Sequence, residues 1–219
     1  MQKNGKENLE LLRHDLESLR FGMKDEPIDI DLLSPLRELN ATSPSFRMPL
    51  YVERNIAPYS YKATTDETIL LFSGGRVSTA TALRLRDLHK NITLLHIEES
   101  PELSCRCLEI AQSLKLPLVI QTSNFKLDGV YRGMMLAHEA IEYAVENEIS
   151  PVVYMGYFYL ASTQNNDKKD WKYCNEFMSA YNRAVGKYIL GADVVGLLPS
   201  YSAVEDEIFR FKEKSKFFA

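Results

Sequence analysis

Seven consecutive residues have the types and the spacing to bind a phosphate group. They follow the apolar run 68–72 directly and are Ser73, Gly74, Gly75, Arg76, Val77, Ser78 and Thr79. The two glycines allow positive φ and a close approach of a ligand to the backbone. Where such a turn opens a helix, free N–H groups and the positive end of the helix dipole attract an anion. The hydroxyl groups in this stretch supply further hydrogen-bond donors.

This turn differs from the two commonest nucleotide-binding loops. It lacks the Gly-Lys-Ser/Thr ending of a Walker loop and the GxGxxG spacing of a dinucleotide fold. Arg76 has two interpretations, because it either pairs with a phosphate oxygen or is a solvated residue in the first helical turn. A cation at a helix N-terminus is unfavourable unless an anion offsets it.

Histidine and cysteine residues are the other candidates for chemistry. His96 ends the apolar run 92–97, where it either contacts a ligand or donates a hydrogen bond to a backbone carbonyl. His138 is predicted to pack on the apolar face of a helix. Cys105 and Cys107 are two residues apart, so a helix turns them away from each other, and no metal site is predicted there. An odd, low count of three cysteines favours reduced thiols and a cytoplasmic location.

Composition narrows the class of protein. The 219 residues are 45% hydrophobic and 26% charged, which suffices for one sizeable α/β domain with an appendage, or for two small domains. A net charge of −4 argues against general binding to nucleic acid. No membrane-spanning helix is expected, since no run of about 18 apolar residues occurs. No secretory signal is expected either, because no apolar core follows the basic first residues.

Residues 1–65 are predicted to form an N-terminal arm ahead of the main domain. Four leucines recur at helical spacing in residues 6–21 and predict an amphipathic helix: Leu9, Leu12, Leu16 and Leu19. That helix either packs on its own domain or binds a partner chain, including a second copy. Residues 25–66 contain five prolines together with apolar side chains. Such a segment is typical of an arm laid over the surface or of a contact region for another chain, with short helical turns expected at 31–39.

Residues 66–219 are predicted to form a doubly wound α/β domain with a five-stranded parallel sheet. The expected strands are 68–72, 92–97, 118–121, 152–155 and 193–198. The first expected helix follows the glycine turn and ends near residue 88, and the later ones cover 101–114, 131–148, 175–190 and 202–212. The polar stretch 162–172 is expected to be a loop. Regular alternation of strands and helices favours a Rossmann-like architecture. Such sheets bind ligands at the carboxyl ends of their strands, where the glycine turn is expected.

The stretch Ser73–Ser78 resembles the SGGxDS loop of the PP-loop ATP pyrophosphatase superfamily. Within that superfamily the chain is most similar to 7-cyano-7-deazaguanine synthases, through three later segments in the same order. These are residues 131–133 before a long helix, residues 152–156, and residues 171–178. The resemblance covers residues 66–212 and implies an adenine nucleotide alpha hydrolase-like fold. The family uses ATP to adenylate a carboxylate on a deazapurine and then ammonia to form a nitrile, in the pathway to queuosine-type bases.

The resemblance also implies roles for individual residues. It places phosphate at Ser73, Gly74, Gly75, Ser78 and Thr79, with Arg76 beside them. It places adenine at the backbone near His96–Glu98, and the substrate pocket near Arg132 and Gly156. ATP or AMP, accompanied by Mg²⁺, is the cofactor that follows from this resemblance.

Three departures from the family pattern affect the expected chemistry. Val77 replaces the loop aspartate, and Glu205 stands near the position of an expected lysine. Only Cys174 remains of the clustered zinc ligands, so no zinc is expected. Two functions therefore stay open. One is a nucleotide-binding protein of the 7-cyano-7-deazaguanine synthase type that is degenerate in catalysis. The other is a non-catalytic component of a larger assembly, with a protein partner or self-association through the N-terminal arm.

Overall fold

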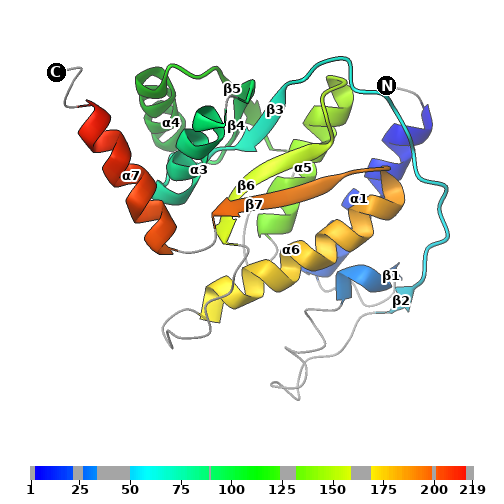
Figure 1. Cartoon of the computed structure of the whole chain (residues 1–219). Coiled ribbons are helices and arrows are strands. Elements are labelled where there is room, and N and C mark those ends of the chain that lie inside the picture. Colours follow the sequence, from blue (N-terminus) through cyan, green and yellow to red (C-terminus); the bar gives the residue numbers. More distant parts are fainter. Residues whose placement is uncertain are drawn as a thin grey trace.

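A parallel sheet forms the centre of the computed structural model, which describes residues 3–21, 27–33, 50–88, 90–123, 132–158, 169–198 and 201–215 (Figure 1). Its five strands are ordered β5-β4-β3-β6-β7, and every neighbouring pair is parallel. Their bounds are β3 Thr68–Leu71, β4 Ile92–Glu98, β5 Leu118–Thr122, β6 Val152–Phe158 and β7 Asp193–Leu198. The predicted five-stranded parallel sheet and its Rossmann-like class are confirmed.

Helices cover both faces of the sheet. Their bounds are α1 Lys3–Phe21, α3 Arg76–Asp87, α4 Pro101–Leu114, α5 Arg132–Glu146, α6 Lys169–Tyr188 and α7 Tyr201–Ser215. Successive strand residues point to opposite faces, so Leu70 and Leu94 pack against α3 and α4, whereas Ile69 and Leu95 pack towards α5 and α6. Apolar residues on both sides of these strands explain why their sequences read as continuous apolar runs.

The strand order reverses between β3 and β6. The chain proceeds outward from β3 through β4 to β5, and then returns across the sheet to β6 and β7 (Figure 1). In open α/β sheets, the carboxyl ends of strands at such a reversal leave a crevice in which ligands bind. The fold therefore directs attention to the segments that follow β3 and β6.

Most elements lie where the sequence predicts them, with two corrections. Strand β6 continues through Gly156 to Phe158 instead of ending at Met155, because it stays paired with β7 through a shift of register. Helix α6 begins at Lys169, inside the stretch expected to be a loop, because neither glycine nor proline interrupts residues 169–175. Residue 131 and residues 162–168 of the predicted elements lie outside the described residues.

The amphipathic N-terminal helix packs on its own chain. Leu9, Leu12, Leu16 and Leu19 of α1 are buried in the same hydrophobic cluster as residues of the sheet, α5 and α6. The leucine face is therefore covered within this chain and is not free to bind a partner. Of the helical turns expected at 31–39, the short 3₁₀ helix η1 (Ile30–Leu33) is observed, and residues 34–39 lie outside the described residues.

Two short strands that the sequence analysis missed hold the arm in place. Strands β1 (Ile28–Asp29) and β2 (Tyr51–Val52) pair in parallel as a separate small sheet. Further along the arm, Tyr59 forms a bridge with Ile189 at the end of α6. The described parts of the arm thus lie against α1 and α6 (Figure 1).

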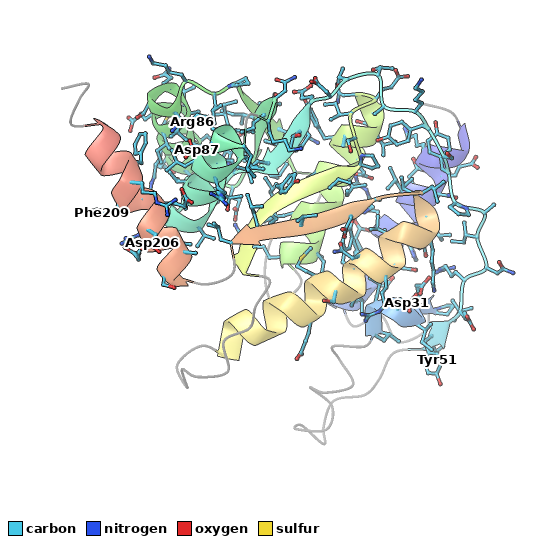
Figure 2. All side chains as sticks on the ribbon, viewed as in Figure 1. Asp31, Tyr51, Arg86, Asp87, Asp206 and Phe209 are labelled. Atoms are coloured by element: carbon cyan, nitrogen blue, oxygen red, sulfur yellow. The ribbon has the colours of Figure 1, made fainter. Side chains whose placement is uncertain are left out.

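Helix α7 lies beside α3 at the opposite end of the molecule from α1 (Figure 2). The guanidinium carbon of Arg86 on α3 lies 5.8 Å from the centre of the Phe211 ring on α7. Along the described ranges, no helix is both long enough and apolar enough to cross a membrane.

Candidate functional site

A cavity of about 220 Å³ opens at the carboxyl ends of β3, β4 and β6, where the strand order reverses. Most residues singled out in the sequence line this cavity, although they come from distant parts of the chain: Ser73, Gly75, Arg76, Ser78, His96, Arg132 and Gly156. Gly74 and Thr79 do not line it. The structure therefore brings the glycine turn together with the candidates from β4, α5 and β6.

The glycine turn has the backbone geometry that opens a helix onto the cavity. Gly74 has φ of +64°, a conformation that side-chain-bearing residues rarely adopt, and an added Cβ would lie 3.1 Å from Cys107 Sγ. Gly75 is the N-cap of α3 and provides no side-chain cap. The N–H groups in the first turn of a helix lack intrahelical partners, so those of α3 are available to a ligand.

The hydroxyl groups of the turn are engaged with the turn itself. Ser78 Oγ donates to the carbonyl oxygen of Gly75 at 3.1 Å and lies 3.2 Å from Ser73 Oγ. Ser73 Oγ in turn lies 3.4 Å from the backbone nitrogen of Gly75. These contacts hold the turn in one shape and leave backbone N–H groups as its main anion-binding donors.

Gly156 allows β6 to approach the start of α3 closely. A Cβ added at Gly156 would lie 2.9 Å from the backbone nitrogen and 3.1 Å from the Cα of Ser78. The missing side chain thus makes room for the first turn of α3. Gly156 therefore contributes to the cavity by leaving space for the glycine turn. This role could not be inferred from the sequence.

Replacing Gly156 with alanine should destabilise the protein by about 1–3 kcal/mol, because backbone atoms must move to accept the methyl group. Urea denaturation measures this loss of unfolding free energy. Gly186→Ala in α6 is the matched control, since its added Cβ meets nothing within 4 Å. We expect that control to be neutral or to stabilise by up to about 1 kcal/mol. Equal losses in the two variants would contradict this account of Gly156.

Both arginines that line the cavity are paired with carboxylates. The guanidinium of Arg76 bonds to Glu205 Oε2 on α7 at 2.5 Å, and the Arg76 side chain is 55% exposed. Arg132 Nε donates to Glu99 Oε2 at 3.0 Å, and one terminal guanidinium nitrogen donates a second hydrogen bond to Glu99 Oε1. Arg76 is thus partly solvated, as one interpretation predicted, but its charge is offset by a carboxylate of the protein.

His96 is buried beneath the glycine turn, and a hydrogen bond to a backbone carbonyl shows that its Nδ1 is protonated. Its Nδ1 lies 2.9 Å from the carbonyl oxygen of Phe72, which only accepts, so Nδ1 carries the proton. The predicted donation to a backbone carbonyl is therefore confirmed. Nε2 is buried, and no hydrogen-bond partner for it occurs in the described part of the chain.

The cysteines near His96 show no sign of reactive chemistry. Cys107 Sγ lies 3.5 Å from His96 Nδ1, and burial raises the pKa of the Cys107 thiol to about 11. A thiol with that pKa stays protonated near neutral pH and is a poor nucleophile. Cys105 is exposed whereas Cys107 is buried, which confirms that the helix turns the two apart. No metal-binding group of His, Cys, Asp and Glu occurs among the described residues.

Sequence reasoning gave Glu99 no role in the cavity, and it did not explain why a valine stands in the glycine turn. Glu99 lines the cavity directly after β4 and neutralises Arg132. Val77 lines the cavity and also packs in a small apolar cluster with Leu198 and Val204, beside α7. That contact explains why an apolar residue is accommodated in a turn that otherwise suits an anion.

Comparison with models of known protein families gives no match, and neither does comparison with curated proteins.

Proposed function

We propose that this chain binds an adenine nucleotide through its phosphates, as a PP-loop protein of the 7-cyano-7-deazaguanine synthase type. One observation carries the proposal. The uncapped N-terminus of α3, preceded by a glycine turn, opens into a cavity at the reversal point of a parallel sheet. Backbone N–H groups and the helix dipole favour an anion at that place.

The size of the cavity suits part of a nucleotide. Its volume of about 220 Å³ is below the roughly 300–1,000 Å³ of pockets that enclose a drug-sized ligand. We therefore assign the phosphate end of the nucleotide to the cavity. The buried His96 Nε2 provides one unsatisfied hydrogen-bonding position for the ligand or for a water molecule.

The side chains around the turn favour binding without turnover. Adenylation releases pyrophosphate, and this step is helped by cations and metal ligands placed around the phosphates. Val77 supplies neither charge nor acceptor, and the charge of Arg76 is offset by Glu205. Mg²⁺ would therefore be held mainly by the phosphates of the nucleotide. We propose that the chain is degenerate in catalysis.

Thermal melting with ATP, AMP and inorganic phosphate tests the binding proposal. Ligand at 100 times its Kd stabilises by about 2.7 kcal/mol, and each kcal/mol raises the Tm of a protein of this size by roughly 2–4 °C. We expect a rise of about 5–10 °C with ATP or AMP. Identical melting curves with and without nucleotide would contradict binding and leave the alternative of a non-catalytic assembly component.

Gly75→Asp is the sharpest variant for this test. An aspartate at an N-cap accepts hydrogen bonds from the first turn of its helix, so the variant should fold at least as well as the wild type. Its carboxylate would also occupy the place of the phosphate and abolish the ligand-induced rise in Tm. Gly75→Asn provides the same cap without the charge and should retain part of that rise. If the wild type releases pyrophosphate from ATP and Gly75→Asp does not, the proposal that the chain is degenerate in catalysis is contradicted.

A further inference from the structure

Arg76 lies between the cavity and a carboxylate of the same chain. It is the first residue of α3, lines the cavity, and bonds to Glu205 of α7 at 2.5 Å. A positive side chain in the first turn of a helix is disfavoured by the helix dipole unless an anion is near. In the structure that anion is the carboxylate of Glu205.

The same arrangement occurs at the second arginine of the cavity, because Arg132 is paired with Glu99. With Glu205 and Glu99 in place, the formal charges of the two arginines are cancelled. An incoming phosphate then meets backbone N–H groups but no uncompensated cation among these four side chains. It also approaches the Glu205 carboxylate, which repels it.

Glu205 is only partly satisfied in this position. Its Oε2 bonds to Arg76, whereas Oε1 is buried and has no hydrogen-bond partner within the described residues. A buried carboxylate oxygen without a partner is unfavourable. A phosphate that bonds to Arg76 takes from Glu205 the one hydrogen-bond partner that the described residues give it, so the phosphate and this carboxylate cannot both be satisfied by Arg76.

A second observation independently points to a ligand in this cavity. The His96 side chain is 99% buried, since its relative exposure is 1%, and it belongs to the cavity lining. Its Nε2 has no hydrogen-bond partner in the described ranges. A buried polar atom in this state is satisfied when a ligand or a water enters the cavity.

We infer that Glu205 competes with the phosphate for Arg76 and thereby weakens anion binding at this site. The inference rests on the proposed function, because it assigns a regulation to the same cavity. It has a consequence for selectivity. A singly charged anion gains little by displacing a carboxylate of equal charge, whereas a phosphate monoester with two charges gains more.

Glu207 offers a matched control on the same helix. Its Oε1 lies 3.7 Å from Arg84 of α3 and 3.6 Å from Arg210 of α7, so it also contributes to the attachment of α7 to α3. Neither Glu207 nor Glu205 lines the cavity, but only Glu205 is bonded to Arg76, which does. Glu207→Gln therefore loosens an α3–α7 ion pair without releasing Arg76.

Isothermal titration calorimetry with inorganic phosphate and with AMP tests the inference on wild type, Glu205→Gln and Glu207→Gln. We expect Glu205→Gln to bind each probe roughly tenfold more tightly, the size of one charge-assisted hydrogen bond, and Glu207→Gln to bind as the wild type does. Glu205→Ala should behave like Glu205→Gln. The melting temperature of each variant without ligand checks that it is folded.

The outcomes separate this inference from the proposed function. If the wild type binds AMP and Glu205→Gln binds it no more tightly, the competition between Glu205 and the phosphate is overturned, whereas nucleotide binding stands. Equal gains in Glu205→Gln and Glu207→Gln would overturn it as well, because general loosening of α7 would then explain both. Absence of binding in all three proteins would overturn the inference and the proposed function together.

Discussion

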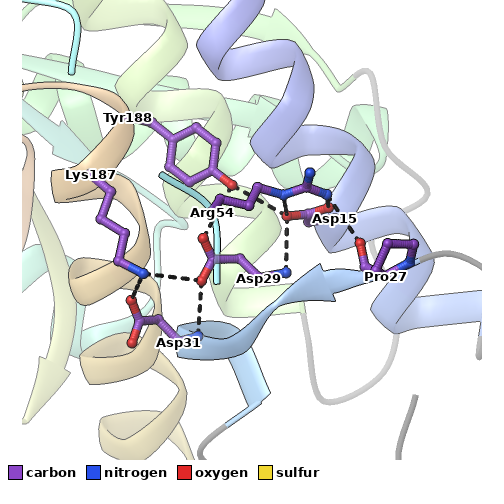
Figure 3. Close-up of polar contacts among 7 residues, drawn as sticks. All are labelled: Asp15, Pro27, Asp29, Asp31, Arg54, Lys187 and Tyr188. Atoms are coloured by element: carbon purple, nitrogen blue, oxygen red, sulfur yellow. Dashed lines mark hydrogen bonds and ion pairs between the residues drawn. The ribbon is translucent and has the colours of Figure 1, made fainter. Parts of the chain in front are cut away.

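Arg54→Met should destabilise the protein by about 3–5 kcal/mol, because it leaves a buried carboxylate without its cation. Arg54 reaches Asp15 of α1 through two hydrogen bonds, from Nε to Oδ2 at 3.0 Å and from a terminal nitrogen to Oδ1 at 2.5 Å (Figure 3). Asp15 is fully buried, whereas the Arg54 side chain is 20% exposed. The hydrogen bond to Asp15 is also the main cause of the raised pKa of Arg54.

The remaining groups around Asp15 do not replace that cation. The Tyr188 hydroxyl lies 3.3 Å from Asp15 and 3.4 Å from Asp29, and its single proton serves only one of them at a time (Figure 3). Burial, and then the charge of Asp15, raises the pKa of Tyr188, so this residue stays neutral. Lys187 pairs with Asp29 and Asp31 on the other side of the network.

Urea denaturation of Arg54→Met measures the predicted loss. Lys6→Met is the control, because Lys6 and Glu10 form an exposed pair at 3.8 Å along α1, and such pairs contribute only about 0.2–0.5 kcal/mol. Adding Asp15→Asn to Arg54→Met should recover part of the stability, since the uncompensated charge is then removed. A loss in Arg54→Met no larger than in Lys6→Met would contradict this account of the network.

Acid should destabilise the protein through His138, by about 2 kcal/mol between pH 7 and pH 5. His138 is completely buried, and this burial, with the charge of Arg13 as a smaller cause, lowers its pKa to about 3. An unfolded chain has the ordinary histidine pKa near 6.5. Between these two values the unfolded state binds one more proton than the native state, so the unfolding free energy falls as pH falls.

The groups around His138 explain why a nearby carboxylate does not reverse this shift. Tyr181 packs against the ring edge-on, and its hydroxyl lies 3.3 Å from His138 Nδ1. Glu142 Oε1 lies 3.2 Å from Nε2, but both oxygens of that carboxylate are bonded to Arg13 of α1. The charge of Glu142 is thus already compensated, and burial dominates.

Unfolding free energies measured from pH 7 to pH 5 test this prediction. His138→Gln should flatten the decrease, because the variant has no group that titrates at this position. A slope that is the same in His138→Gln and in the wild type would show that another group causes the acid sensitivity.

Local sequence signals predicted the central fold well, because they are set by neighbouring residues. Helix α4 begins after Ser100, whose hydroxyl accepts a hydrogen bond from the N–H of Leu103, and Pro101 stands in its first turn. These are ordinary start signals of a helix. The bounds predicted for α4 and β7 agree with the structure for the same reason. The turn at Gly74 was predictable because few residues other than glycine adopt a positive φ.

Long-range pairings could not be predicted in the same way. Arg54 meets Asp15 across 39 residues, and Arg76 meets Glu205 across 129. Each pair depends on how helices pack, which no local pattern records. The same limit explains Gly156, whose role depends on the distance between β6 and the first turn of α3. Sequence thus located the candidate turn, whereas its carboxylate partners and its close packing required the structure.

Backbone amide chemical shifts during a titration with AMP show whether a phosphate binds at the glycine turn. We expect saturable shifts at the N–H groups of Gly75, Arg76, Val77 and Ser78, because these groups surround the N-terminus of α3. Adenosine, which lacks the phosphate, should leave the same amides unchanged at equal concentration. Shifts confined to other parts of the chain, or equal shifts with adenosine and AMP, would contradict a phosphate site at this turn.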